Sequence, residues 1–146
     1  MSSLEIRGER GIRVIIEIHG YENEYADNYY DANWLRCSVQ LKTDKLRGEN
    51  DTSFQTADFM RFLSELEQLV GFKASCATFQ TLEDAFNLSI EIDKTGHTLV
   101  SGILREYPGS YNAISFRFES DQSFLAIVVT QLRKIVREFP EIQIDD

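Results

Sequence analysis

Two stretches with helical periodicity, each preceded by residues that alternate between apolar and polar, constrain the fold of this chain more than any other feature. Apolar side chains recur every three to four residues within 59–70 and again within 124–139. This spacing places them on one face of a helix. We therefore predict amphipathic helices over Thr56–Val70, with Thr56 as the N-cap, and over Asp121–Phe139, which Pro140 ends.

The segments around these helices alternate with a period of two, which is typical of half-buried β-strands. The alternation covers 12–19, 34–42, 85–92, 97–105 and 113–119, with shorter candidates at 4–7 and 73–79. The polar segment 44–53 contains Gly48, Asn50 and Asp51, and it is interpreted as a turn. Strands with one polar face suit an antiparallel sheet that packs on one side only. The predicted fold class is α+β, with two layers: an antiparallel β-sheet of about six strands and two amphipathic helices on one face.

The length of 146 residues fits a single domain spanning 1–146, and no internal sequence repeat is visible. The two cysteines, Cys37 and Cys76, lie in alternating segments and form no metal-binding CxxC pair, so both are expected to be reduced. The charged N-terminus has no signal-peptide core, and no apolar run approaches the length of a membrane helix. We expect a cytoplasmic location.

The formal net charge of −9 restricts the partners that the chain can attract. Phosphate backbones and anionic membranes would be repelled, so we expect neither nucleic acid nor a membrane as partner. A basic protein would be attracted instead, although the charge could also serve solubility alone. The sequence leaves the oligomeric state open between a monomer and a weak homodimer.

Residues with catalytic or ligand-binding patterns are scarce. There are only two histidines, His19 and His97, and neither has the close His or Cys neighbours of a zinc site. The chain contains no phosphate-binding glycine loop, dinucleotide-binding glycine motif or nucleophile-elbow serine. We therefore expect no catalytic residues, no metal, no cofactor and no enzymatic activity.

The segment 21–31 has the most unusual composition, because it combines four tyrosines and four acids without a single base. Tyrosine supplies contact area at low entropic cost, and carboxylates can meet Arg and Lys side chains of a partner. The alternative is that some tyrosines pack onto the core and the acids are merely solvated. The candidate partner-binding residues are Tyr21, Glu22, Glu24, Tyr25, Asp27, Tyr29, Tyr30 and Asp31. Trp34, which follows directly, is expected to pack in the core.

Several stretches taken in order resemble the WapI family of bacterial immunity proteins. They are Asp31–Leu35, Thr56–Phe59 with Phe62 and Leu66, Leu88–Ile90, Gly96–His97 with Val100 and Gly102, Asn112–Phe116, and Asp121–Leu125. The similarity extends over about 34–136, and the acidic segment before Trp34 lies outside the shared pattern. The resemblance implies a small cytosolic protein that binds and neutralises a cognate toxin domain, often a nuclease. The alternative interpretation is a small-ligand-binding or uncharacterised enzymatic α+β domain, which would require a deep pocket with convergent polar groups.

Overall fold

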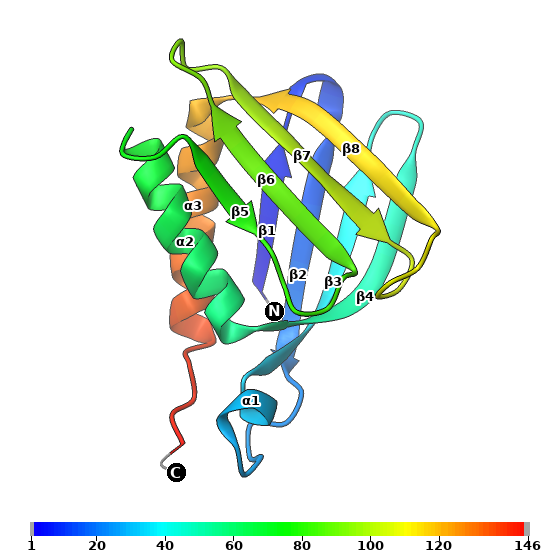
Figure 1. Cartoon of the computed structure of the whole chain (residues 1–146), viewed down its shortest axis with the longest axis vertical. Coiled ribbons are helices and arrows are strands. Elements are labelled where there is room, and N and C mark those ends of the chain that lie inside the picture. The colour runs from blue at the N-terminus through cyan, green and yellow to red at the C-terminus, as the bar shows by residue number, and fades with distance from the viewer. Residues whose placement is uncertain (1, 145–146) are drawn as a thin grey trace.

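The computed structural model describes residues 2–144, which form two antiparallel sheets of four strands each (Figure 1). The first sheet has the order β1-β2-β3-β4 and the second the order β5-β6-β7-β8. The strands of the first sheet are β1 (Ser2–Arg7), β2 (Arg13–Tyr21), β3 (Trp34–Lys42) and β4 (Arg47–Gln55). The second sheet consists of β5 (Cys76–Phe79), β6 (Phe86–Ile92), β7 (Thr98–Arg105) and β8 (Ala113–Ser120). The prediction of an α+β fold with antiparallel strands is confirmed, but the single sheet of about six strands is wrong.

The helices complete two halves with the same element order. A long helix follows each sheet: α2 (Thr56–Val70) follows β4, and α3 (Gln122–Glu138) follows β8. A 3-10 turn, η1 (Glu9–Gly11), joins β1 to β2, and a one-turn helix, α1 (Tyr29–Ala32), lies between β2 and β3. Each long helix packs against the first strand of the other half, α2 on β5 and α3 on β1, and the two helices pack on each other. None of the helices in this described range is long and apolar enough to cross a membrane.

The inner faces of the two sheets and the apolar faces of α2 and α3 share one core. Figure 1 shows the two helices side by side along one flank of the paired sheets. Phe54 of β4 lies at the centre, with its ring centroid 5.0 Å from that of Phe79 and 6.4 Å from that of Phe86. The helical spacing predicts burial of Leu63, Leu66, Val128, Leu132 and Val136. Leu66, Val128 and Leu132 are buried, whereas Leu63 and Val136 are only half-buried. The helices therefore close the gap between two sheets and do not cover one face of a single sheet.

The segment 44–53 is a turn only at its beginning, because β4 starts at Arg47. Its inward positions are Gly48, Asn50, Thr52 and Phe54, so the strand carries polar or small residues where the sheets meet. A Cβ atom on Gly48 would lie 2.6 Å from Ile114 Cδ1 of β8, which is too close for any larger residue without movement. The close approach of the sheets thus explains a strand that lacks the usual apolar alternation.

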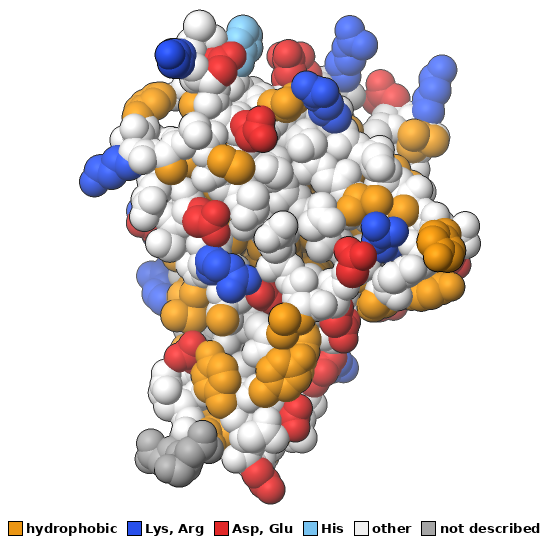
Figure 2. Space-filling view, viewed as in Figure 1, with side chains coloured by type: hydrophobic (Ala, Val, Ile, Leu, Met, Phe, Trp, Pro, Cys, Tyr) orange, Lys and Arg blue, Asp and Glu red, His pale blue; other side chains and the backbone are white. Residues whose placement is uncertain are grey.

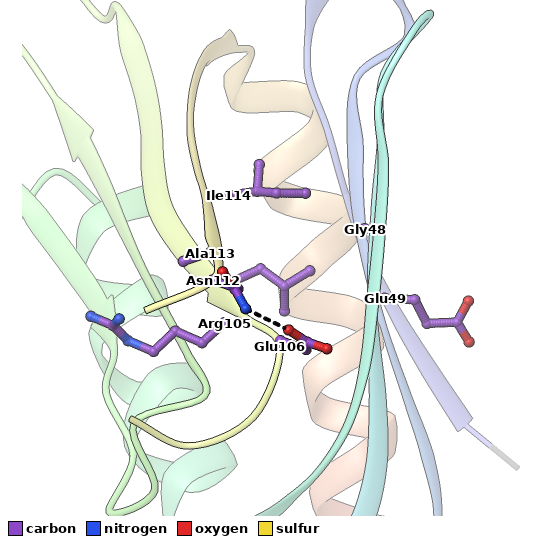
Figure 3. A pocket seen from close by; sticks show the side chains of 8 residues that line it. Gly48, Glu49, Arg105, Glu106, Asn112, Ala113 and Ile114 are labelled. Atoms are coloured by element: carbon purple, nitrogen blue, oxygen red, sulfur yellow. Dashed lines mark hydrogen bonds between the residues drawn. The ribbon is translucent and has the colours of Figure 1, made fainter. Parts of the chain in front are cut away.

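A small hollow of about 220 Å³ lies at this meeting of the sheets (Figure 3). Its main polar contact is internal, since Asn112 Nδ2 donates to Glu106 Oε2 over 3.1 Å. Figure 3 shows the side chains of Glu49 and Arg105 pointing away from the hollow on opposite sides. The hollow therefore offers few free polar groups to a ligand.

Both helix starts are fixed by carboxylates. Asp121 accepts a hydrogen bond from the Ser123 backbone N–H at 2.8 Å and is the N-cap of α3; the sequence leaves the cap open between Ser120 and Asp121. The N-cap of α2 is Gln55 and not Thr56, and Asp58 in the first turn accepts a hydrogen bond from the Gln55 N–H at 2.8 Å. A carboxylate in the first turn also interacts favourably with the helix dipole.

Candidate functional site

The acidic and aromatic segment forms a projection from the end of the first sheet, which we call the protrusion (residues 22–33). Figure 1 shows it, with α1, extending beyond the body of the molecule next to the C-terminal segment. The segment was predicted as a loop, but it contains the single helical turn of α1. Asn28 caps this turn, because its side-chain oxygen accepts a hydrogen bond from the Asp31 N–H at 2.9 Å. The protrusion therefore has a defined local structure.

Asn33 anchors the protrusion to two distant parts of the chain. Its side chain is buried, and its Nδ2 donates to the carbonyls of Tyr29 at 2.8 Å and Ile142 at 2.9 Å. Its Oδ1 accepts from the Ile142 N–H at 2.8 Å and from Thr56 Oγ1 at 2.9 Å. All hydrogen-bonding groups of the amide are used in this way. A partner that binds the protrusion would therefore meet a preorganised surface.

Two of the four tyrosines contribute to this anchoring. Tyr21 belongs to β2, packs edge-to-face on Phe139 and donates its hydroxyl to the Pro140 carbonyl. Tyr29 donates its hydroxyl to Glu141 Oε2 at 2.6 Å. This hydrogen bond, helped by partial burial and by the charge of Glu141, raises the pKa of Tyr29 to about 12. Tyr21 and Tyr29 therefore tie the protrusion to the C-terminal segment.

The other two tyrosines are the most exposed of the four, although Tyr29 also remains 37% exposed. Tyr25 is 89% exposed and Tyr30 is 49% exposed. The Tyr30 ring is held edge-on against Trp34, with ring centroids 5.2 Å apart and an interplanar angle of 87°. Trp34 was predicted to pack in the core, but it is only half-buried. An exposed ring held by another ring loses little entropy on binding, as is common at interface hot spots.

All four predicted carboxylates of the segment are exposed. Glu22 accepts a hydrogen bond from Ser53 of β4, and Asp31 accepts one from Asn28 Nδ2 at 2.8 Å. Glu24 and Asp27 lie between them on the outer part of the protrusion. Figure 2 shows hydrophobic side chains gathered in the region of the protrusion with acidic side chains beside them. The structure therefore brings the predicted acids and aromatic rings onto one projecting element.

A groove of about 500 Å³ lies beside the protrusion, and sequence reasoning missed it. Its lining comes from three separate parts of the chain. These are Tyr29 and Tyr30 of α1; Gln55 at the end of β4 with Ala57, Asp58, Arg61 and Glu65 of α2; and Thr78, Gln80, Thr81 and Leu82 of β5 and the following loop. No local pattern could have indicated it, because the three parts meet only after folding. The one available signal was the charged pair of Asp58 and Arg61 on a single helical turn.

Asp58 and Arg61 form an ion pair in the groove. The Asp58 side chain is 5% exposed, and its Oδ1 accepts a hydrogen bond from Arg61 Nη2 at 2.8 Å. The same guanidinium nitrogen donates to the Gln80 carbonyl at 3.1 Å, so it bridges α2 and the segment after β5. Burial raises the pKa of the Asp58 carboxyl, although the hydrogen bonds from Gln55 and Arg61 act against this shift. A cation at this position therefore stabilises a desolvated carboxylate.

The remaining titratable groups form no compact reactive cluster. Cys37 is buried and Cys76 is exposed, and both are free thiols, as predicted. Burial raises the pKa of the Cys37 thiol, which disfavours the nucleophilic thiolate. His19 contacts Ser38 Oγ at 2.9 Å on the outer face of the first sheet. Among residues 2–144, no three His, Cys, Asp or Glu side chains are arranged to hold a metal ion.

A row of basic residues crosses the outer face of the first sheet at the end opposite the protrusion. Antiparallel pairing places Arg7 opposite Arg13, Arg13 opposite Lys42, and Lys42 opposite Arg47. Glu5 offsets part of this charge through contacts of 3.0 Å with Arg7 and 3.4 Å with Arg13. Like charges on directly opposite residues destabilise a sheet. We call these four residues the basic row.

These features define a small α+β domain whose candidate site is a projecting surface with an adjoining groove. The fold resembles that of the MRP1/MRP2 proteins of Trypanosoma brucei, with a TM-score of 0.50 at 9% identity over 93% of this chain and 83% of the other. A guide-RNA-binding protein complex bound to a guide RNA is similar as well, with a TM-score of 0.50 at 8% identity over 90% of this chain and 82% of the other. At such low identity these likenesses concern the fold alone. No curated protein matches the chain.

The family model of the WapI-like immunity proteins matches residues 5–140. The chain therefore belongs to the WapI-like immunity protein family, as its sequence motifs suggested. The match includes the protrusion, the groove and both long helices.

Proposed function

We propose that the chain neutralises a basic toxin domain, such as a nuclease, by binding it in the cytoplasm through the protrusion. The observation that carries this proposal is the protrusion itself, which is anchored at its base yet exposes Tyr25, Tyr30 and four carboxylates. Membership of an immunity protein family supports a toxin as the partner. The net charge of −9 supports a basic one, because complementary charge increases the rate of association.

Binding kinetics of the cognate toxin domain, produced from the neighbouring gene, test this proposal. The first variant neutralises all four acids of the protrusion with Glu22→Gln, Glu24→Gln, Asp27→Asn and Asp31→Asn. These amides retain the oxygen that accepts hydrogen bonds from Ser53 and Asn28. We expect slower association, with a deficit that shrinks as salt concentration rises through screening.

A second quadruple variant provides the matched control, because it removes four negative charges elsewhere. It combines four substitutions of exposed acids outside the protrusion: Glu9→Gln, Asp44→Asn, Glu91→Gln and Glu119→Gln. We expect it to bind nearly as fast as the wild type. Equal association rates for the two quadruple variants would assign the effect to net charge and would remove the protrusion from the proposed interface.

The tyrosines are expected to affect dissociation instead. Tyr30→Ala removes an exposed ring that Trp34 holds in place, and a central hot-spot tyrosine contributes about 2 kcal/mol or more. We therefore expect faster toxin release from Tyr30→Ala, and Tyr25→Ala tests the ring at the outer part of the protrusion. Unchanged dissociation and full protection by both folded variants would contradict the assignment of the interface.

A second candidate function is nucleic-acid binding, and the basic row is the observation that favours it. A row of four cations is a common way to contact phosphates, and one of the similar folds is described in complex with a guide RNA. The net charge of −9 opposes this function. Fluorescence anisotropy with single-stranded RNA and DNA tests it: salt-sensitive binding that is lost in an Arg13→Gln/Lys42→Gln variant would favour this candidate over the toxin.

A further inference from the structure

We infer that the groove beside the protrusion is a binding site for an arginine side chain of a protein partner, and that Arg61 of the chain itself fills this site in the free protein. The inference rests on the proposed function in one respect, namely that the partner is a basic protein. It adds a defined site, which shares only Tyr29 and Tyr30 with the protrusion, and a competing internal ligand, Arg61, which lies outside it.

The contacts of Arg61 show what the groove accepts. One guanidinium nitrogen donates both to Asp58 Oδ1 at 2.8 Å and to the Gln80 carbonyl at 3.1 Å. These acceptors lie on different walls, one on α2 and one after β5. A guanidinium is planar, weakly hydrated and able to stack on aromatic faces, so it suits a groove with tyrosine walls better than the strongly hydrated ammonium of lysine.

Exchange of one guanidinium for another is energetically feasible at this position. Asp58 is buried, and its Oδ2 already accepts from the Gln55 N–H at 2.8 Å, so its Oδ1 needs a cationic partner. Arg61 supplies that partner from a side chain that is 53% exposed. It can therefore swing into water with little loss of packing, while an incoming arginine keeps the Asp58 carboxylate satisfied.

The rest of the lining suits the remainder of an arginine side chain. Tyr29 and Tyr30 line the side of the protrusion, where an aromatic face can attract a guanidinium. Leu82 on the opposite loop is 70% exposed and can cover the aliphatic stem. Glu65 adds a second carboxylate, whose contacts with the Thr78 backbone N–H and hydroxyl are both long, at 3.4 Å. The groove thus combines two carboxylates with apolar and aromatic walls.

Titration with the peptide N-acetyl-Gly-Arg-Gly-amide, followed by NMR of the tyrosine rings and leucine methyls, tests this site without any toxin. We expect saturable shifts at Tyr29, Tyr30 and Leu82 in the wild type. The Arg61→Gln variant should bind the peptide several-fold more tightly, because it has lost the internal competitor. Glu65→Gln should bind more weakly, and the corresponding lysine peptide should bind more weakly than the arginine peptide.

Arg133→Gln is the matched control, since Arg133 is also an exposed arginine beside a glutamate, 3.8 Å from Glu67, and lies outside the groove. Equal tightening by Arg61→Gln and Arg133→Gln would reduce the effect to net charge and overturn the inference. Weaker binding by Arg61→Gln, or shifts spread evenly over the surface acids, would overturn it as well. Failure of this titration leaves the protrusion experiment unaffected, so the two proposals can fail separately.

Discussion

Asn50 provides the sharpest test of how the two sheets are joined. Its side chain is buried on β4 and its Nδ2 donates to two carbonyls that flank the second sheet, Arg105 at 2.7 Å and Ala85 at 3.2 Å. Its Oδ1 has no hydrogen-bond partner among the described residues. Replacement by aspartate changes few atoms, but it removes both donors and places a negative oxygen against two carbonyl oxygens.

The expected loss of stability follows from these contacts. Asn50→Ala should cost about 1–3 kcal/mol, because it removes the side-chain donor to the Arg105 carbonyl; the Ala85 carbonyl still accepts from the Arg105 N–H at 2.8 Å. Asn50→Asp should cost about 3–5 kcal/mol at neutral pH, as expected for an uncompensated buried charge. A domain of this kind has a total stability of about 5–15 kcal/mol, so the aspartate substitution should remove a large share of it.

The effect should depend on pH in a defined direction. Burial beside carbonyls raises the folded-state pKa of the new carboxyl above its unfolded value of about 3.9, and each unit of difference corresponds to about 1.4 kcal/mol. The folded state then holds a proton that the unfolded chain loses, so stability falls as pH rises from about 4 until the raised folded pKa is passed. Protonation at low pH also restores one donor to the carbonyls.

Urea denaturation of the wild type, Asn50→Ala and Asn50→Asp between about pH 4 and 7.5 measures these differences. Asn23→Asp, an exposed position on the protrusion, introduces the same charge without burial and serves as the control. The reasoning is refuted if Asn50→Asp is as stable as Asn50→Ala at neutral pH, or if the difference between Asn50→Asp and the control is independent of pH.

Three further predictions concern the helices, the protrusion and the basic row. Leu132→Ala should cost about 2–5 kcal/mol in urea denaturation because Leu132 is fully buried, whereas Ile127→Ala on the exposed side of α3 should cost less than about 0.5 kcal/mol; similar costs would mean that the buried face is misassigned. The pKa of Tyr29 is about 12 in the folded state against 10.0 in the unfolded chain, so the unfolding free energy of the wild type should fall more steeply with pH than that of Tyr29→Phe between pH 10 and 12. Parallel curves of unfolding free energy against pH, or a phenolate absorbance titration without a late-titrating tyrosine, would contradict this. Lys42→Glu places a negative charge between two cross-strand arginines and should raise the free energy of unfolding by about 0.5–1 kcal/mol at low salt, with a smaller gain at high salt. Destabilisation at low salt would show that repulsion between the like charges does not reduce the stability of the wild type.

The sequence alone was sufficient for the helices and for most strands. The apolar stripes at helical spacing predicted α2 and α3 to within a residue at their ends, since burial of one helix face is imposed by local periodicity. Residues alternating around β3 and β6 predicted those strands for the same reason. β4 was missed because its inward positions do not alternate as apolar residues. Gly48 lies close to Ile114 of the second sheet, and Asn50 donates a hydrogen bond to the Arg105 carbonyl of β7.

The sequence likewise predicted one part of the candidate site and missed another. Composition identified the segment 21–31, which forms most of the protrusion, because it holds four tyrosines and four acids without a base. It could not show that Tyr21 and Tyr29 would be turned towards the C-terminal segment, since their hydrogen-bond partners lie more than a hundred residues away. The groove with Arg61 was equally hidden, because its walls come from α1, α2 and the loop after β5.

The sequence by itself therefore determined most of the local elements, the acidic net charge and the segment 21–31 of unusual tyrosine and acid content. Only the tertiary structure decided that eight strands divide into two sheets, which residues of the protrusion are free, and where a groove opens beside it. The physical reason is that side-chain periodicity records which face of an element is buried but not which element buries it. That pairing is fixed by contacts such as Asn50 to β7 and Asn33 to the C-terminal segment, which join residues distant in sequence.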